Sequence, residues 1–203
     1  MKKFDRLPPE QRRAEIRAAA LRLFREKGFA ATTMENIVEQ VTLSKGGVYR
    51  LYPSTSSILE DLMLEGMHLR NNFYAQRVEE ELAAGRALTL PFLVELIGDS
   101  LLLYPEFSAV YVEFLWEKQR NPELEALYQQ LCATTVRETT ELIRRCGAQE
   151  LLLADESMLR RLTELMNAAI LSLQVLDLRQ VAEEKKHQIC RAMIQILTGP
   201  LSE

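Results

Sequence analysis

The sequence predicts an all-α protein, and three observations support that prediction. Apolar residues recur at helical spacing along the chain, and no segment shows the alternating pattern of a strand. The periodic segments end at helix-breaking residues, namely Gly28, Pro53, Pro105, Pro122 and Gly199-Pro200. With 203 residues, 47% of them hydrophobic and 27% charged, the chain can bury a sizeable core. We expect an N-terminal three-helix domain over residues 1–53 and a larger helical domain over residues 54–203.

Residues 32–53 contain two short helical patterns separated by a turn. Thr32 or Thr33 can cap the first helix, whose apolar stripe is Met34, Ile37, Val38 and Val41. Ser44 can cap the second helix, which has a buried side of Val48, Leu51 and Tyr52 and ends before Pro53. Helices this short are not stable alone, so they must share a core with a neighbour. This arrangement predicts a helix-turn-helix unit.

The neighbour is the strongly amphipathic segment from Pro9 to Lys27. Its apolar residues are spaced as one helix face, namely Ile16, Ala19, Ala20, Leu23 and Phe24. Gly28 is expected to end this helix as a left-handed cap. Three helices would then enclose one small core.

In helix-turn-helix units, the second helix lies in the DNA major groove with its first residues at the base edges. The exposed face of this helix would present Lys45, Gly46, Gly47, Tyr49 and Arg50. Adjacent glycines are unfavourable inside a helix. Either they allow the backbone to approach DNA closely or they form a simple Gly-Gly turn, and the spacing alone favours neither.

The segment from Gly28 to Leu59 resembles the DNA-binding region of TetR/AcrR-family repressors, and the resemblance extends over about residues 9–65. It rests on Gly28-Phe29, Thr32-Thr33, Ile37, Ser44-Lys45-Gly46, Tyr49, an aromatic residue at 52 and Ser54. The implied DNA-binding residues are Thr33, Ser44, Lys45, Gly46, Gly47, Tyr49, Arg50, Tyr52 and Ser54. The chain departs from the family pattern at three positions. The family usually has glycine where this chain has Thr42, histidine or tyrosine where it has Leu51, and lysine where it has Thr55. The last two positions commonly contact phosphates in the family.

The charge is distributed unevenly along the chain. Residues 1–53 carry 11 Lys and Arg against 6 Asp and Glu, whereas the other 150 residues carry 14 against 23. A basic first part before an acidic second part indicates a polyanionic partner for the first part only. A solvated, charged helix face would also explain part of this excess.

Several other classes of function find little support. No apolar run approaches 18 residues and no secretory signal is seen, so we expect a cytoplasmic protein with no membrane partner. Cys132, Cys146 and Cys190 form neither a disulfide framework nor a metal-spaced cluster. With two histidines and no glycine-rich phosphate loop, we expect no catalytic residues, no cofactor and no metal site.

The second part of the chain predicts a long helix from Ser54 to about Leu82 and then three helices separated by prolines. The long helix has two apolar stripes, so it should pack against two bodies. The family resemblance implies a pocket for a small, often apolar effector among the middle helices. Apolar and aromatic side chains line such pockets, and the candidates are Phe92, Leu96, Tyr104, Phe107, Tyr111, Phe114 and Trp116.

The last two predicted helices span Glu156–Leu178 and Glu183–Leu197. The first is apolar nearly all round after Ala168, which is more than one body can cover. A second copy of the chain is therefore expected against them, and the family resemblance implies the same four-helix dimer interface. The interface residues would be Leu162, Ala169, Leu173, Leu176, Ile189, Met193 and Leu197. The alternative is a monomer that keeps both helices internal.

Together these features predict a DNA-binding transcriptional regulator and not an enzyme. We expect a homodimeric repressor that binds a double-stranded DNA operator and is released by a small, largely apolar effector. The alternative is a helical protein–protein interaction module whose basic N-terminal part binds a protein partner.

Overall fold

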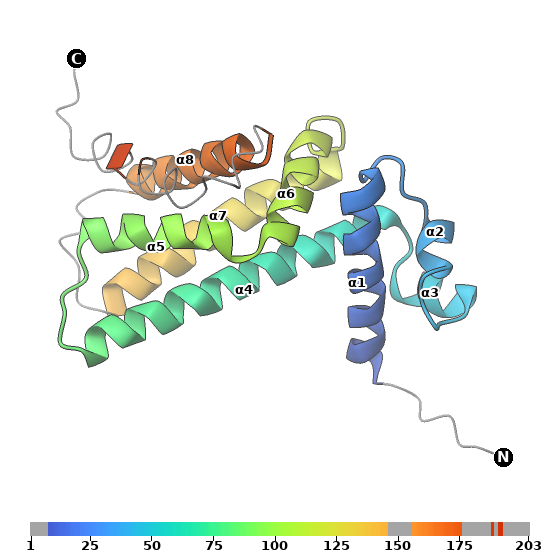
Figure 1. Cartoon of the computed structure of the whole chain (residues 1–203), viewed down its shortest axis with the longest axis horizontal. Coiled ribbons are helices and arrows are strands. Elements are labelled where there is room, and N and C mark those ends of the chain that lie inside the picture. Colours follow the sequence, from blue (N-terminus) through green and yellow to red (C-terminus); the bar gives the residue numbers. More distant parts are fainter. Residues whose placement is uncertain (1–7, 146–155, 176–187, 189–190, 193–203) are drawn as a thin grey trace.

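The computed structural model describes residues 8–145, 156–175, 188 and 191–192, and these residues are helical with connecting turns (Figure 1). The all-α prediction is therefore confirmed. The helices are α1 (Pro9–Lys27), α2 (Met34–Val38), α3 (Lys45–Leu51), α4 (Thr55–Ala83), α5 (Leu90–Leu103), α6 (Pro105–Glu117), α7 (Pro122–Arg145) and α8 (Glu156–Val175).

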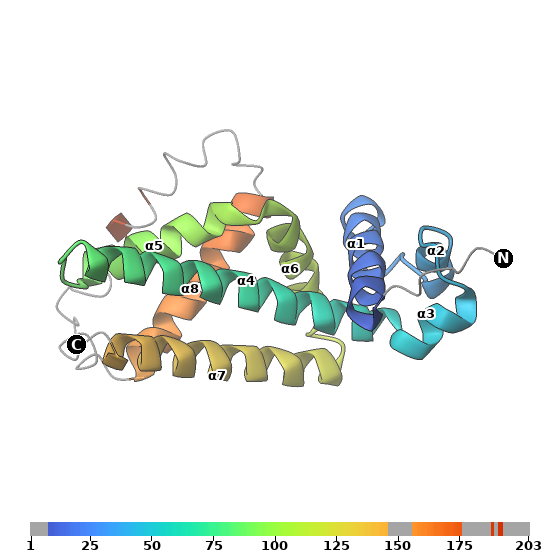
Figure 2. The same cartoon turned by 90° about the horizontal axis from the view of Figure 1, so that it is seen from below.

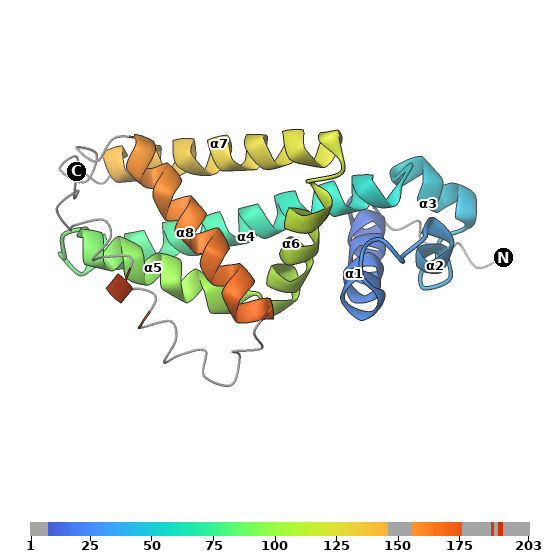
Figure 3. The same ribbon diagram turned by 90° about the horizontal axis from the view of Figure 1, so that it is seen from above.

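Helix α4 is the axis of the molecule. Helices α1, α2 and α3, here called the N-terminal unit, lie at its first end, and α5, α6, α7 and α8 pack along the rest (Figures 1 and 2). Seen from above, α8 crosses α4 obliquely between α7 and α5 (Figure 3). Helix α6 is also in contact with α1, so two helices of the larger part support the N-terminal unit.

Short polar side chains set the starts of several helices. Thr33 caps α2 by accepting a hydrogen bond from Asn36 N, Ser44 caps α3 through Gly47 N, and Ser54 caps α4 through Ser57 N. Of the two threonines proposed as the first cap, Thr33 has that role. Thr32 is buried and donates instead to the Gly28 carbonyl at 2.8 Å.

Two glycines behave differently from the simplest expectation. Gly28 has φ of +83° but ψ of 157°, so it ends α1 in an extended glycine conformation and not as a left-handed helical cap. Gly66 lies inside α4, where an added Cβ would be 3.0 Å from Cδ1 of Phe107. This close approach indicates that the glycine relieves crowding between α4 and α6. In addition, α2 ends at Val38, one turn before the predicted stripe ended at Val41.

One hydrophobic core extends from the N-terminal unit into the larger part. Ile16 and Phe24 of α1 share it with Ile58 and Leu62 of α4 and with Phe114 of α6, and each of these side chains is at most 1% exposed. The core is thus continuous across the residue 53–54 boundary. The division of the chain into domains 1–53 and 54–203 stays a prediction.

Arg17 links α1 to α4 at the edge of this core. Its guanidinium lies 3.0 Å from Asp61 Oδ2, 2.7 Å from Glu65 Oε2 and 2.8 Å from Glu10 Oε1. The Arg17 side chain is 12% exposed. Burial lowers the pKa of Arg17, but the bonds to Glu10 and Tyr52 and the charges of Glu65 and Asp61 raise it overall above its usual value. The guanidinium therefore stays charged and holds the start of α4 against α1.

Some predicted features lie outside the described residues. These are the cysteines Cys146 and Cys190 and nearly all of the predicted helix at Glu183–Leu197. The basic residues Lys2, Lys3 and Arg6 near the start of the chain also lie outside them. Within the described part of the chain, we find no helix that combines the length and the apolar character needed to cross a membrane.

We expect Arg17→Ala to lower the free energy of unfolding by about 1.5–3 kcal/mol, because Asp61 and Glu65 lose a partly buried, charge-assisted partner. Arg22→Ala is the matched control, since Arg22 is exposed on the same helix. It should change stability by less than about 0.5 kcal/mol. Urea unfolding of the two variants measures the difference, and equal effects would show that Arg17 contributes no more than a surface residue.

Candidate functional site

Helix α3 presents basic side chains and a glycine to solvent. Lys45, Gly46 and Arg50 are exposed, and a Cβ built on Gly46 has no neighbouring atom within 4 Å. Gly47 is different, since a Cβ there would lie 3.3 Å from the capping Ser44 Oγ. Both glycines lie in the first turn of α3, so the pair is not a separate Gly-Gly turn. The bare backbone at Gly46 can be approached closely by a large partner.

A carboxylate on α2 engages two predicted contact residues of α3. Glu35 Oε1 accepts from Lys45 Nζ at 3.0 Å and from the Tyr49 hydroxyl at 3.1 Å. The hydrogen bond from Lys45 lowers the pKa of Glu35, and the same bond raises the pKa of Lys45. The ammonium also lies 5.6 Å from the centre of the Tyr49 ring. In this state, Glu35 neutralises the only lysine of α3.

Tyr52 requires a correction, because it was proposed as a DNA-binding residue. Its side chain is only 2% exposed, and its hydroxyl donates to Asp61 and accepts a 3.5 Å bond from Arg17. Tyr52 therefore packs inside the N-terminal unit and supports α3 from behind. Thr33 and Ser54 are exposed, but their hydroxyls cap α2 and α4.

The three departures from the family pattern have different surroundings. Thr42 is held by Glu15, which accepts from the Thr42 amide at 2.6 Å and from its hydroxyl at 3.1 Å. Leu51 is half-buried against the core. Thr55 is the first residue of α4 and is half-buried. At position 51, one of the two positions that contact phosphates in the family, the leucine side chain packs against the core and offers no polar group.

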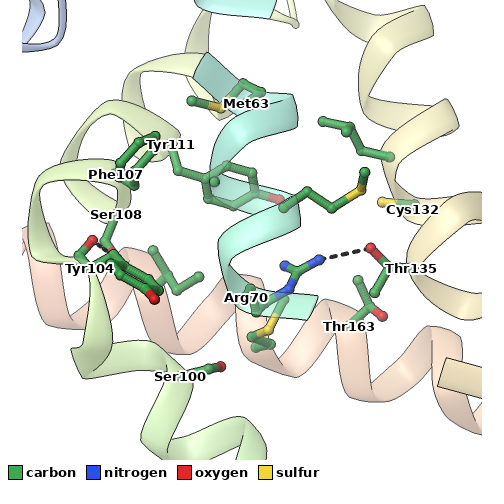
Figure 4. Close-up of a pocket in the computed structure, with 15 residues that line it drawn as sticks. Met63, Arg70, Ser100, Tyr104, Phe107, Ser108, Tyr111, Cys132, Thr135 and Thr163 are labelled. Carbon is green, nitrogen blue, oxygen red and sulfur yellow. Dashed lines mark hydrogen bonds between the residues drawn. The ribbon is translucent and has the colours of Figure 1, made fainter. Parts of the chain in front are cut away.

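A cavity of about 90 Å³ lies between α4, α6, α7 and α8, with the last turn of α5 at its edge (Figure 4). Its walls are mostly apolar and aromatic, with several hydroxyl groups and one arginine. The lining residues are Met63, Gly66, Met67, Arg70, Ser100, Tyr104, Phe107, Ser108, Tyr111, Leu131, Cys132, Thr135, Thr163, Met166 and Ile170.

The structure brings three of the predicted pocket residues, Tyr104, Phe107 and Tyr111, to this cavity. The other four lie elsewhere. Phe92 and Leu96 pack with Tyr74 and Val78 in a separate cluster, and Phe114 is fully buried in the main core. Trp116 is 58% exposed and stacks near Arg120. The aromatic pattern of α6 therefore faces three environments and not one.

Helix α4 supplies a wall that the aromatic pattern did not reveal. Met63, Gly66, Met67 and Arg70 follow the spacing i, i+3, i+4 and i+7, so they form one face of α4. Two of them, Met63 and Met67, belong to a stripe that is visible in the sequence. That stripe could have located the pocket wall, whereas the inward position of Arg70 could not be read from its residue type.

A buried polar group joins three helices beside the cavity. Asn167 of α8 is 7% exposed and accepts from the Tyr111 hydroxyl of α6 at 3.0 Å. Its amide donates to the Tyr128 hydroxyl of α7 at 3.0 Å. Burial raises the pKa of both tyrosines, that of Tyr128 to about 12, so both hydroxyls stay protonated at neutral pH. The bonds hold α6, α7 and α8 in register around the pocket.

Only part of the predicted dimer surface can be placed. Ala169 is 6% exposed inside the chain, next to Met166 and Ile170, so it faces the protein's own core rather than a second copy. Leu171, at 37%, is an exposed apolar residue of α8. The side chains of Leu162 and Leu173 are outside the described part of the structure, as are the whole residues Leu176, Ile189, Met193 and Leu197.

Metal ligands do not gather in the described part of the chain, where no group of three or more His, Cys, Asp or Glu residues could hold an ion.

The features present are a short helix-turn-helix with an exposed basic second helix, and a helical domain with an internal pocket. Together they define the class of helix-turn-helix regulatory proteins.

Comparison with known proteins gives the family. Residues 16–62 match the family described as bacterial regulatory proteins, tetR family. An uncharacterized HTH-type transcriptional regulator of Bacillus subtilis, YfiR, is 40% identical over 58 residues, which is 29% of this chain and 28% of that relative. The chain therefore matches little more than a quarter of that relative's length. The N-terminal part of the chain is therefore similar to the TetR family of bacterial regulatory proteins.

Solved structures share the fold over nearly the whole chain. A TetR-family transcriptional regulator from Syntrophomonas wolfei has a TM-score of 0.76 at 14% identity, with coverage of 96% of this chain and 99% of that one. FadR of Thermus thermophilus, a TetR-family repressor in complex with lauroyl-CoA, has a TM-score of 0.64 at 24% identity, with coverage of 95% and 97%. The larger helical part therefore also has the fold of TetR-family regulators.

The different positions of Phe114 and Trp116 can be tested by stability. Phe114→Ala should cost about 3–5 kcal/mol, because a fully buried ring is removed from the core. Trp116→Ala should cost less than about 1 kcal/mol, since it removes an exposed ring and one surface cation–π contact. Chemical denaturation of both variants gives the comparison. Similar losses would place Trp116 inside the protein.

Proposed function

We propose that the chain is a transcriptional repressor that binds a double-stranded DNA operator as a homodimer. A small, largely apolar effector in the cavity between α4, α6, α7 and α8 releases it. Residues 1–53 act as the DNA-binding domain, and residues 54–203 act as the effector-binding and dimerisation domain in the cytoplasm. The proposed DNA-contacting residues are those on the outer face of α3, namely Lys45, Gly46, Tyr49 and Arg50, with Gly47, Ser44, Thr33 and Ser54 placing the helix ends.

One observation carries this proposal: two of the helices that line the cavity, α4 and α6, also hold the N-terminal unit. Helix α4 contributes Met63 and Met67 to the cavity, and Asp61, two residues before Met63, to Arg17 of α1. Helix α6 contributes Phe107 and Tyr111 to the cavity, and its Glu113 accepts from Phe29 N at 3.3 Å. A displacement of either helix by a ligand must therefore move these contacts.

The proposed mechanism depends on the spacing of two α3 helices in a dimer. Both must enter major grooves one helical turn, about 34–36 Å, apart. A ligand that enlarges the cavity would push α4 and α6 away from α7 and α8 and rotate α1–α3 with them. Since packed helices move as rigid bodies, a small rotation at the cavity becomes a larger displacement at α3. Simultaneous contact with both half-sites is then lost.

The apolar character of the effector is supported by the cavity walls and by one similar structure. Most lining side chains are apolar or aromatic. The Thermus FadR structure holds lauroyl-CoA, which contains a long apolar chain. A larger, more polar space of about 640 Å³ lies between α7 and α8 and shares Cys132 and Thr163 with the cavity, so a longer ligand has room to extend there.

Gel-shift titration on the DNA upstream of the chain's own gene tests the function. We expect binding that weakens at high salt, as phosphate contacts require. Lys45→Ala should lose about tenfold or more per half-site, and the dimer should remain folded. Arg22→Ala is the control for loss of a positive charge from an exposed position of α1. A protein that binds no DNA fragment, or a Lys45→Ala variant that binds normally, would contradict the proposal.

The contact between Glu35 and Lys45 gives a further prediction. Glu35→Gln should raise operator affinity about fivefold per half-site, because a negative charge is removed near the phosphates and Lys45 is released. Glu39→Gln is the matched control, since it removes the same charge from the exposed end of α2. Fluorescence anisotropy at constant salt compares the two. Equal gains would show a general charge effect with no specific role for Glu35.

Thr55 offers a prediction on salt dependence. Thr55→Lys restores the residue usual in the family at the start of α4, so each half-site should gain one phosphate contact. The slope of log K against log salt should then steepen by up to about 2 units for a dimer. Affinity should rise for operator and random DNA alike, because phosphate contacts carry no sequence information. An unchanged slope across several salt concentrations would show that residue 55 faces away from DNA.

A further inference from the structure

Arg70 is the one charged residue in the wall of the cavity, among the residues described there. It extends from α4 toward α7, where its Nη2 donates to Thr135 Oγ1 at 2.9 Å (Figure 4). Its Nε is buried and finds no hydrogen-bond partner in the described part of the chain. The guanidinium is a permanent positive charge with five N–H donors and no acceptor.

Two other partly buried arginines of the structure are paired with carboxylates. Arg17 is surrounded by Glu10, Asp61 and Glu65, and Arg77 lies 3.7 Å from Glu80 and 4.0 Å from Asp99. No such ion pair forms at Arg70 among the described residues, although Glu138 is near enough to bond to the adjacent Asn71. A cation in a mostly apolar cavity without a counter-ion is unfavourable, and an anion that enters the cavity would relieve the penalty.

We propose that the effector carries a carboxylate, which Arg70 binds inside the cavity. The planar guanidinium presents a fork of donors that matches the two carboxylate oxygens. The hydroxyl of Thr135 already accepts from Arg70, so its own proton is directed away from the arginine and is available to the ligand. This inference rests on the proposed effector site and specifies the chemistry that the site selects.

The walls and volume define the rest of the ligand. Met63, Met67 and Phe107 provide apolar surface in the cavity wall, so the body attached to the carboxylate is apolar. A cavity of about 90 Å³ is smaller than the ~150 Å³ that accommodates benzene. The body that fits without rearrangement is therefore a short chain. A longer one must extend past Cys132 and Thr163 into the space between α7 and α8.

Matched acids and amides test the charge requirement directly, without DNA. Butyrate and hexanoate are compared with butyramide and hexanamide by calorimetry and by thermal shift at pH 7.5. We expect at least one acid to bind about tenfold or more tightly than its amide, as a charge-assisted hydrogen bond implies. Arg70→Met should abolish this preference, and Arg70→Lys should retain part of it.

Arg77→Met is the matched control, because Arg77 lies two turns further along α4 and also has a buried, unpartnered Nε, yet has carboxylates beside it. It should leave the acid preference intact. Without ligand, Arg70→Met should melt no lower than the wild type, since removing an unpaired charge relieves a penalty. A markedly lower melting temperature would instead show that the fold already satisfies Arg70.

Equal binding of acid and amide, no binding by any of the four compounds, or an acid preference that survives Arg70→Met would overturn the inference. Hexyl phosphate provides a separate comparison. Tighter binding than hexanoate would replace the carboxylate with a phosphate monoester as the recognised group. The gel shift is independent of these measurements. Operator binding without acid binding would leave the proposed function standing, and acid binding without operator binding would leave only the ligand site.

Discussion

The N-terminal unit depends on its packing against α4 and α6. Helices α2 and α3 span only Met34–Val38 and Lys45–Leu51, which is far below the length at which an isolated helix is stable in water. Their buried residues Ile37 and Val48 join a core that includes Ile58 and Leu62 of α4. The position of α3 is therefore determined by α4 as much as by α1. A chain packed in this way cannot keep α3 in place while the start of α4 moves.

Polar contacts at the edge of this core give the packing a defined orientation. Hydrophobic contacts alone would tolerate some sliding of α1 on α4, whereas the bonds of Arg17 to Asp61 and Glu65 define their register. The single bond from Phe29 N to Glu113 does the same for α6. Asn167 is the counterpart at the pocket, where it joins Tyr111 and Tyr128. Buried polar groups of this kind are satisfied in only one arrangement, so they favour discrete states over gradual deformation.

Helix boundaries could be predicted from the sequence because they depend on local chemistry. Pro9 and Gly28 bound α1, and Ser44 and Ser54 cap α3 and α4 by bonds that reach only three residues along the chain. The composition of the pocket could not be predicted in the same way. Phe107, Tyr111 and Phe114 share one apolar stripe of α6, yet the first two face the cavity and the third is buried in the core shared with α1. Which part of a stripe meets which neighbour is decided by the crossing of helices that are distant in sequence.

The position of Arg70 in the cavity wall could not be predicted from the sequence either, because its residue type indicates a solvated side chain. An arginine on a long helix is normally solvated, and its spacing from Met63 and Met67 is also compatible with a charged side chain at the edge of an apolar face. Only the three-dimensional structure shows that α7 and α8 close over it. Gly66 is equally dependent on this closure, because any side chain there would be driven into Phe107. The face of α4 that lines the cavity thus combines a position kept free of side-chain atoms with a charge that has no carboxylate counter-ion among the described residues. Both features make the folded, unliganded protein less stable than one with a filled core. A ligand that fills the space and pairs with the charge would restore that lost stability. Arg17 of α1 is bonded to this same helix, α4. The free energy of ligand binding at the cavity can therefore be used to change the position of α1–α3.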